Sequence, residues 1–562
     1  MGRFTVTEHV LAKRLCREDI VPNLSEAFGD LAGSHHLLLS DCGRTRVQGT
    51  VSGLRLVFHA RLADVPVVSD RSDVLAALTG ADVDSSVLAL ALLGQTCPHP
   101  LVDRSVWQGV TAVPPGYHVT IDNTAARTER WWNPPDADLS VREGAQLMLQ
   151  ALVTGVDART TAGGTMSADL SGGLDSTPLS FLAARNSSAL IAVTQSGDHA
   201  RNDDEYWATR AASYLPNCQH LIYPFAKLPL PYADFDVAMN GPDEPGSLGR
   251  MWGRQVVLAS RVADAGSRVH LNGQGGDEVL RAPMSYVHDL ITHRPREAWR
   301  HIQPRRARGR WTLGATMAAL ADRRTYRRWL ESVVADLTPR LDGDRRTPPF
   351  GWSSRPQLPP WASAHASETA RDLIIRASGE AEPLGRKHSV HSALVSVQGG
   401  ARAMRHLGRL TAAFGVSLEL PFYDKAVIEA GLAVRPEESA APWDFKPVMV
   451  EAMCGIVPDE LLARRTKGAI GADIWAGLDA LRPMIADWID NLRLAEHGLV
   501  DRDALRRACL DLYPPRLPTT FLETTLGLEA WLRAQENRDP FRGDDASAAL
   551  AHSKEIAPDA AS

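Results

Sequence analysis

Short apolar runs alternate with amphipathic segments through the middle of the chain. Apolar runs typical of buried strands occur at Ala189–Thr194 and His220–Tyr223, and segments with helical spacing occur at Asp204–Tyr214 and Met251–Ala265. Strands that alternate with helices at this spacing predict a parallel β-sheet covered on both faces by helices. The fold class predicted for this region is therefore α/β.

The two ends of the chain carry different patterns. Residues 1–135 contain short strand-like runs with two helical stretches, and from Lys425 onward the pattern is mostly helical. The segment Asn133–Asp138, with its two prolines, is typical of a linker. We therefore expect an α+β domain over 1–135, a larger domain over 140–540 and a disordered tail over 541–562.

A glycine turn after one predicted strand carries the most informative chemistry. Residues 168–177 read Ala-Asp-Leu-Ser-Gly-Gly-Leu-Asp-Ser-Thr, which predicts the end of a strand, a tight turn and the start of a helix. The glycines let the backbone approach an anion, and the helix N-terminus directs positive potential toward it. No Gly-Lys-Ser/Thr follows, so the turn is not a Walker A loop. The candidate phosphate-binding residues are Ser171, Gly172, Gly173, Asp175 and Ser176.

A second glycine turn follows the predicted strand Arg268–Asn272. Residues 273–278 read Gly-Gln-Gly-Gly-Asp-Glu. Because open α/β sheets bind ligands beyond the carboxyl ends of their strands, we expect Asp175 and Asp277 to share a Mg²⁺ ion. For Glu278, metal contact and capping of the next helix are both open.

These two turns resemble the PP-loop and the second acidic motif of the asparagine synthetase B superfamily, which includes β-lactam synthetases and lasso peptide cyclases. The resemblance implies an N-terminal degenerate glutaminase-like (Ntn-type) domain, followed by a PP-loop ATP pyrophosphatase domain with a largely helical C-terminal part. It implies ATP and Mg²⁺ as cofactors, and places Leu170, Val193 and Gly273 around the adenosine. Further similar segments are Pro66–Asp70, Val113–Gly116, Trp131-Trp132, Asp203–Glu205, Asp243–Pro245, Leu418–Asp424, Lys446-Pro447, Val457-Pro458 and Arg465–Gly468.

The resemblance also implies roles for two lysines. Lys446 opens a predicted helix and matches a phosphate contact, and Lys467 matches the catalytic lysine of a loop that closes over the nucleotide. Such a lysine meets the charge that develops during acyl transfer. We expect Arg464 and Arg465, which precede it, to be solvated, as most arginines are.

Two departures from the family pattern indicate which branch of the superfamily the chain resembles. Gly2 stands where glutamine-using members carry a nucleophilic cysteine, and the nearest cysteine is Cys16, so we expect a first domain without glutaminase chemistry. Gln274 stands where asparagine synthetases usually have Glu and β-lactam synthetases have Tyr, and a neutral amide cannot accept a proton at pH 7. A peptide α-amine, with a pKa of about 7.7–8.0, needs less help from a base. Neutral drift at Gln274 is the alternative.

The combined features predict an ATP-dependent macrolactam synthetase resembling a lasso peptide cyclase, with Lys467, Lys446 and Gln274 as its catalytic residues. ATP would adenylate an Asp or Glu side chain of a ribosomally made precursor peptide, and the peptide's N-terminal amine would displace AMP. The expected partners are the precursor peptide, a leader peptidase and a leader-binding protein. The alternatives are an ammonia-dependent asparagine synthetase, another small-substrate amidating synthetase, or an ATP-binding pseudoenzyme that scaffolds a biosynthetic complex.

Composition narrows the expected partners and location. The 562 residues carry a net charge of −6, which gives no general attraction to nucleic acid or to an anionic membrane. The N-terminal residues lack a signal-peptide core, and the longest apolar run, Val87–Leu93, is too short to span a bilayer. We therefore predict a cytoplasmic protein. Its six cysteines form no Cys-x-x-Cys pair, which suits reduced thiols and gives no zinc motif.

A basic and proline-rich insertion is expected over 293–385. Seven arginines fall within His293–Trp311, and Arg323, Arg324, Arg327 and Arg328 follow on a predicted helix. A solvated helical face is the favoured interpretation, and docking of an acidic peptide or partner protein is the alternative. Nucleic-acid binding has no aromatic-interleaved motif to support it.

Overall fold

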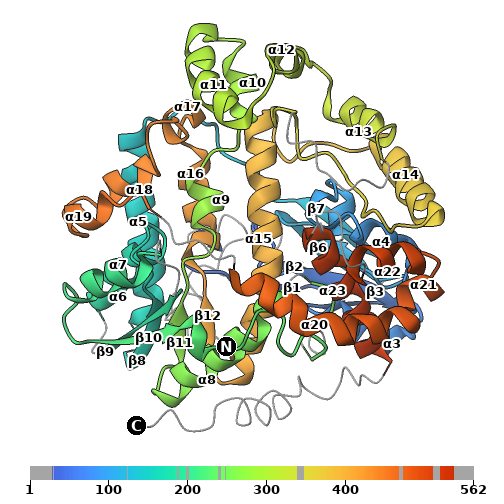
Figure 1. Cartoon of the computed structure of the whole chain (residues 1–562), viewed down its shortest axis with the longest axis horizontal. Helices are drawn as coiled ribbons and strands as arrows, with labels where there is room; N and C mark the ends of the chain where they lie inside the picture. The colour runs from blue at the N-terminus through green and yellow to red at the C-terminus, as the bar shows by residue number, and fades with distance from the viewer. Residues whose placement is uncertain are drawn as a thin grey trace.

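The computed structural model describes most of the chain, and the described residues form three β-sheets surrounded by helices (Figure 1). The described residues are 28–29, 31–122, 125–161, 163–186, 189–197, 202–237, 242–246, 248–337, 347–466, 472–510 and 519–536.

Two antiparallel sheets form the N-terminal part. The first has the order β1-β2-β6-β7 and the second the order β4-β3-β5. Their inner faces share a small core of Val47, Val57, Val113 and Val119. On its other side, β3 packs against α3 through Phe58 and Leu75. The elements are β1 (Leu37–Asp41), β2 (Arg44–Gln48), β3 (Val57–Leu62), β4 (Val65–Ser69), α3 (Ser72–Thr79), α4 (Ser85–Ala91), β5 (Thr111–Val113), β6 (Tyr117–Ile121) and β7 (Ala126–Arg130).

The third sheet is parallel and has the order β10-β9-β8-β11-β12. The first strand of this sheet in the sequence, β8, lies in the middle. The chain adds β9 and β10 on one side of it and then β11 and β12 on the other side. The order of such a sheet reverses between β8 and β11, and ligands of open α/β sheets bind at this reversal. The strands are β8 (Thr165–Asp169), β9 (Ala189–Ser196), β10 (Cys218–Pro224), β11 (Val269–Leu271) and β12 (Ser417–Glu419).

Helices cover both faces of the parallel sheet. Because side chains alternate along a strand, Leu190 and Ala192 of β9 join the core under α5 and α6, whereas Ile191 and Val193 join Leu258 of α8. The long helix α15 contacts β12 and α8. These helices are α5 (Val141–Thr160), α6 (Ser176–Ala184), α7 (Asp204–Ala212), α8 (Trp252–Asp264), α15 (His388–Ala413), α16 (Lys425–Leu432) and α18 (Pro447–Ala452).

Figure 1 shows α15 running through the centre of the molecule, with the parallel sheet on one side and the antiparallel sheets on the other. The largest core joins α4 of the N-terminal part to α14, α20 and α23. The remaining helices are α9 (Gly276–Leu280), α10 (Tyr286–Leu290), α11 (Pro295–Gly309), α12 (Leu313–Ala321), α13 (Tyr326–Val334), α14 (Ala364–Ser378), α17 (Pro436–Ser439), α19 (Asp459–Leu462), α20 (Ala472–Asp490), α21 (Arg493–Glu496), α22 (Arg502–Leu510) and α23 (Thr519–Gln535).

The predicted α/β class is confirmed, with an antiparallel N-terminal part, a parallel sheet and a helical C-terminal part. The expected linker, Asn133–Asp138, connects β7 to α5 without helix or strand. The helix predicted for Arg323 and Arg324 is wrong at its start, because α13 begins at Tyr326, where Thr325 caps it. Among the described helices, none combines the length and apolar character needed to cross a bilayer.

Candidate active site at the carboxyl ends of β8 and β11

The two glycine turns lie against each other at the reversal of the parallel sheet. They follow β8 and β11, which are adjacent strands. A Cβ atom on Gly273 would stand 2.8 Å from the backbone nitrogen of Ser176, and one on Gly276 would stand 2.1 Å from Asp175 Oδ1. Larger residues at either glycine would push the first turn away. The glycines are therefore required by the close approach of the two turns.

The first turn is held by its own serines. Ser176 Oγ accepts a hydrogen bond from the Ser171 backbone N–H at 3.0 Å and lies 2.9 Å from Ser171 Oγ. Gly172 has a φ of 70° and packs against Trp207 so closely that a Cβ atom would stand 2.4 Å from Trp207 Cβ. Asp175 is the N-cap residue of α6, so the turn leads directly into a helix N-terminus. This arrangement is suited to bind an anion.

Lys446 joins the acidic residues of the two turns. Its Nζ lies 2.5 Å from Asp175 Oδ1 and 2.8 Å from Asp277 Oδ1. The lysine is 2% exposed and has a φ of 51°, in the left-handed region, with Pro447 beginning α18 directly after it. Such backbone conformations in residues other than glycine carry strain and gather at functional sites. The structure thus brings together three residues that the sequence analysis predicted for the site.

The carboxylates of Asp175 and Asp277 fit the predicted magnesium site. Both reach one cation, the Lys446 ammonium, so the two turns can present oxygen ligands to a common point. Their side chains remain 24% and 40% exposed, which leaves room for the water ligands that Mg²⁺ usually retains. We call Asp175 and Asp277 the acidic pair, and Lys446 forms an ion pair with both of them.

Arg464 is a part of the site that the sequence analysis assigned wrongly. It was expected to be solvated, but it is 5% exposed and donates to the Ser171 carbonyl oxygen at 2.8 Å. It also donates to Asp203 at 2.7 Å and to Asp204 at 2.5 Å, at the start of α7. The fixed fork of the guanidinium lets one side chain tie the first turn to α7. Arg465 is exposed, as expected.

The acidic segment Asp203–Glu205, which resembles a segment of the family, was the feature of the sequence that could have predicted an acidic partner for Arg464. Asp203 also accepts from Trp207 Nε1 at 3.0 Å and from Thr466 Oγ1 at 2.5 Å. Hydrogen bonds from Thr466 and Arg464 lower the pKa of Asp203 against a raising effect of burial. Asp203 therefore remains ionised and holds the segment before Lys467 against the first turn. Lys467 itself and Gly468 lie outside the described residues.

Glu278 lies deeper than Asp277. Glu278 and Tyr423 both lie close to Gly400 of α15. A Cβ atom on Gly400 would stand 3.0 Å from Glu278 Oε1 and 2.4 Å from the Tyr423 hydroxyl oxygen. Burial, followed by the charges of Asp277 and Asp175, raises the pKa of Glu278. A carboxyl group with a raised pKa beside the acidic pair is a candidate for proton transfer.

The residues expected around the adenosine fall in different environments. Leu170 is fully buried, and its backbone N–H donates to the Val193 carbonyl oxygen at 2.8 Å. Val193 lines a cavity together with Asp169 and Asn272, whose Nδ2 donates to Asp169 Oδ2 at 2.7 Å. Gln274 is exposed, and its backbone N–H donates to Asn272 Oδ1 at 2.8 Å. Asp169 and Asn272 are polar residues at this strand edge that the sequence analysis did not single out.

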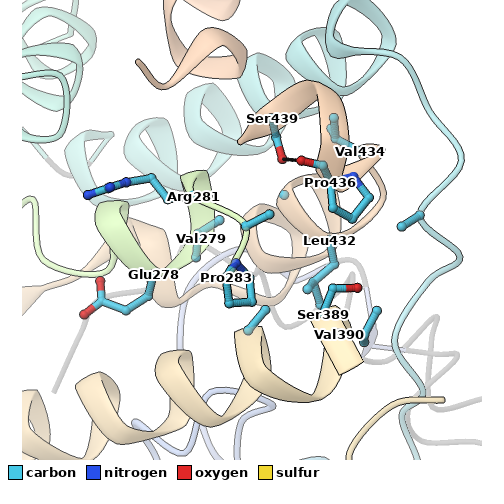
Figure 2. A pocket seen from close by; sticks show the side chains of 14 residues that line it. Glu278, Val279, Arg281, Pro283, Ser389, Val390, Leu432, Val434, Pro436 and Ser439 are labelled. Atoms are coloured by element: carbon cyan, nitrogen blue, oxygen red, sulfur yellow. Dashed lines mark hydrogen bonds between the residues drawn. The ribbon is translucent and has the colours of Figure 1, made fainter. Parts of the chain in front are cut away.

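A second cavity opens beside Glu278. Its lining combines the end of α9 with the first turn of α15 and the segment after α16 (Figure 2). Figure 2 shows Glu278 on α9 and Arg281 directly after this helix, with Val279 and Leu432 among the apolar side chains of the lining. The cavity has a volume of about 30 Å³, which is room for one or two water molecules and not for a substrate.

Asp243, from the other acidic segment, lies away from this site in a buried ion network. It accepts from Arg405 at 2.9 Å and from Arg409 at 2.9 Å, and the Ser72 backbone N–H donates to it at 3.3 Å. Although burial opposes its charge, Arg405 and Arg409 hold its pKa far below the usual range. Its role is to join α15 to the N-terminal part.

The sequence profile of the asparagine synthase family matches residues 147–533, which include both glycine turns, Lys446 and Arg464. A comparison with curated proteins finds no match.

Proposed function

Because this chain belongs to the asparagine synthase family of ATP-dependent amide-forming ligases, we propose that it closes a macrolactam ring in a ribosomally made precursor peptide. The site binds the pyrophosphate part of ATP at the turn after β8. An Asp or Glu side chain of the peptide is adenylated, and the peptide's own N-terminal amine forms the isopeptide bond. This is the reaction of a lasso peptide cyclase.

The observation that carries the nucleotide part of the proposal is the contact of Lys446 with both Asp175 and Asp277. Two carboxylates and one ammonium, from three separate segments, converge beside a helix N-terminus that attracts anions. Asp175 and Asp277 are the residues that would hold Mg²⁺, which when bound supplies positive charge to phosphate oxygens. In this proposal Lys446 contacts the same phosphates.

Two bonds form and two bonds break in the proposed reaction, apart from the proton transfer. A carboxylate oxygen of the peptide attacks the α-phosphorus of ATP, and pyrophosphate leaves with the electrons of the broken P–O bond. The N-terminal amine then attacks the acyl carbon, AMP leaves, and the amine's proton passes to a base or to water. Lys446 and Lys467 would stabilise negative charge in these steps, and Arg464 holds the turn that binds the pyrophosphate.

The side chain of Gln274, at the second glycine turn, supports a peptide as the substrate. Gln274 is a neutral, exposed side chain at the second turn, where asparagine synthetases usually have Glu, and a neutral amide cannot accept a proton at pH 7. We propose a leader peptidase and a leader-binding protein as partners, and the cytoplasm as the location.

Mass spectrometry of a reaction with Mg-ATP and the precursor peptide encoded beside the gene tests the proposal. We expect a peptide product lighter by one water, formed together with AMP and pyrophosphate. A parallel reaction contains aspartate and ammonia in place of the peptide. Asparagine and AMP formed only in that reaction would identify an ammonia-dependent asparagine synthetase instead. No ATP turnover in either reaction would favour a scaffold without catalysis.

A further inference from the structure

Three potential metal ligands lie together at the junction of α10 and α15. His288 and Asp289 belong to α10, and His388 is the first residue of α15. Their ligand atoms all lie within 4.8 Å of one another. None of the three has a role in the proposed reaction. Two imidazoles and a carboxylate are a ligand set typical of zinc sites.

The hydrogen bond of His288 fixes which ring nitrogen can bind a metal. Its Nε2 lies 2.5 Å from the backbone carbonyl oxygen of Asp322. A carbonyl oxygen only accepts, so Nε2 carries the hydrogen and the lone pair lies on Nδ1. Metal-binding histidines almost always donate their other N–H to a carbonyl or carboxylate in this way. His288 is therefore already in the tautomer that a metal requires.

The other two ligands are held in place by α15 and by an aromatic ring. Asp289 accepts from the backbone N–H groups of His388 at 3.2 Å and of Ser389 at 3.0 Å, which fixes its carboxylate at the helix start. His388 Nδ1 lies 3.5 Å from Asp289 Oδ1. The His388 ring stacks on Trp352, with ring centroids 3.8 Å apart. Two ligands are thus oriented before any ion binds.

The rings of His288 and His388 are adjacent, with their centroids 4.1 Å apart. Ligand atoms of a tetrahedral zinc site lie about 3.4 Å apart when the bonds are about 2.0–2.1 Å long. The three atoms therefore have to move closer by roughly an ångström, which side-chain rotation can supply.

We propose that His288, Asp289 and His388 form a structural binding site for a divalent transition metal, with Zn²⁺ as the preferred ion and water as a further ligand. The bound ion would join α10 to α15 and, through Asp322, to the segment after α12. It would thereby fasten the helical insertion to the central helix. The sequence offered no zinc motif because its ligands come from segments far apart in the chain.

Co²⁺ titration of the chelator-treated full chain tests the site. The measurement uses the Asp175→Asn variant with excess Mg²⁺ present, which keeps the acidic pair from contributing. We expect one equivalent of Co²⁺ to give visible bands of low-symmetry coordination, and Zn²⁺ to displace it. His288→Gln, Asp289→Asn and His388→Gln should each weaken binding at least about 10- to 100-fold. The control is His293→Gln, an exposed histidine just after α10, which should change nothing.

Thermal unfolding gives a second readout that does not depend on colour or on catalysis. Zn²⁺ should raise the Tm of the chelator-treated protein and of His293→Gln, and should not raise that of the three ligand variants. Circular dichroism confirms which variants are folded, and any one folded ligand variant suffices. Co²⁺ binding equal to that of the control in a folded ligand variant would overturn the proposal. So would a wild-type Tm unchanged by Zn²⁺, since the cluster would then be only a hydrogen-bonded helix cap.

Discussion

Replacing Lys446 tests the site most directly, because its charge and its backbone conformation can be separated. Lys446→Met keeps a long side chain but removes the ammonium from between Asp175 and Asp277. Lys446→Gly also removes the charge, but glycine adopts the φ of 51° without strain. A difference between the two variants reports the backbone strain together with the packing of the buried side chain, and the loss that both variants share reports the effect of the charge.

The size of the stability effect follows from the two contacts. At 2.5 and 2.8 Å from Asp175 and Asp277, and with an effective dielectric constant of about 20, each contact has a gross Coulomb energy of about 6–7 kcal/mol. Desolvation of the ammonium offsets most of this, and removing one member of a buried ion pair costs about 3–5 kcal/mol. Because the carboxylates stay partly hydrated, we expect about 3 kcal/mol for Lys446→Met. Lys446→Gly relieves about 1 kcal/mol of left-handed strain, but it also removes the packing of a side chain that is 2% exposed, so it should be less stable than Lys446→Met.

Catalysis should fall in both variants by the same amount. Loss of one preorganised donor at a developing negative charge lowers kcat by about 10²–10³-fold. The assay follows AMP and pyrophosphate at saturating Mg-ATP and peptide, with urea unfolding measured in parallel. Lys227→Met, which removes an exposed lysine, is the matched control and should keep full activity.

Two outcomes would refute this reasoning. If Lys446→Met turns over like the control, the lysine does not contact the phosphates of the nucleotide during the reaction. If Lys446→Gly is active while Lys446→Met is not, the backbone conformation rather than the charge is what the site requires.

Three further changes probe the surroundings of the site. Gly276→Ala places a methyl group 2.1 Å from Asp175 Oδ1, so AMP formation should fall at least about 10-fold, as expected when a reacting group is displaced by roughly an ångström; activity equal to wild type would show that the two turns can separate. Arg405→Met leaves the fully buried Asp243 short of a partner and should cost about 3–5 kcal/mol in urea unfolding; a loss within the error of the measurement would show that Arg409 alone compensates the charge. For Glu278, a raised pKa means that its contribution to stability is present below the ordinary value of 4.5 and is lost as the pH rises through the folded-state pKa. The stability of Glu278→Gln relative to wild type should therefore increase between pH 4 and pH 8, and a constant difference over that range would contradict the raised pKa.

The positions of the two glycine turns were predictable because their geometry is local. A strand followed by Ser-Gly-Gly, or by Gly-Gln-Gly-Gly, specifies a tight turn wherever it occurs. The strands and helices around the turns were also placed within a few residues. For example, the segment predicted as a strand at Ala189–Thr194 is β9, Ala189–Ser196. Alternating periodicity along the chain was sufficient for this.

The partners of charged residues were not predictable in the same way. Arg464 was expected in solvent, since an arginine in a polar segment usually is, but Asp203 and Asp204 lie 2.7 and 2.5 Å from it in the fold. Asp243 was grouped with the acidic motifs of the family, and only the position of α15 shows that it belongs to a buried ion network instead. Burial depends on what packs against a residue, and that is set by segments remote in the chain.

The sequence by itself determined the α/β class, the two glycine turns and the family, because periodicity, turn chemistry and motif spacing are properties of short segments. Only the tertiary structure decided that Lys446 stands between Asp175 and Asp277, that Arg464 is buried, and that His288 meets His388. These contacts join residues from distant parts of the chain, so their existence depends on how helices pack around the sheet. A charge or a lone pair becomes a site only when that packing brings its partners within a few ångströms and removes the water between them.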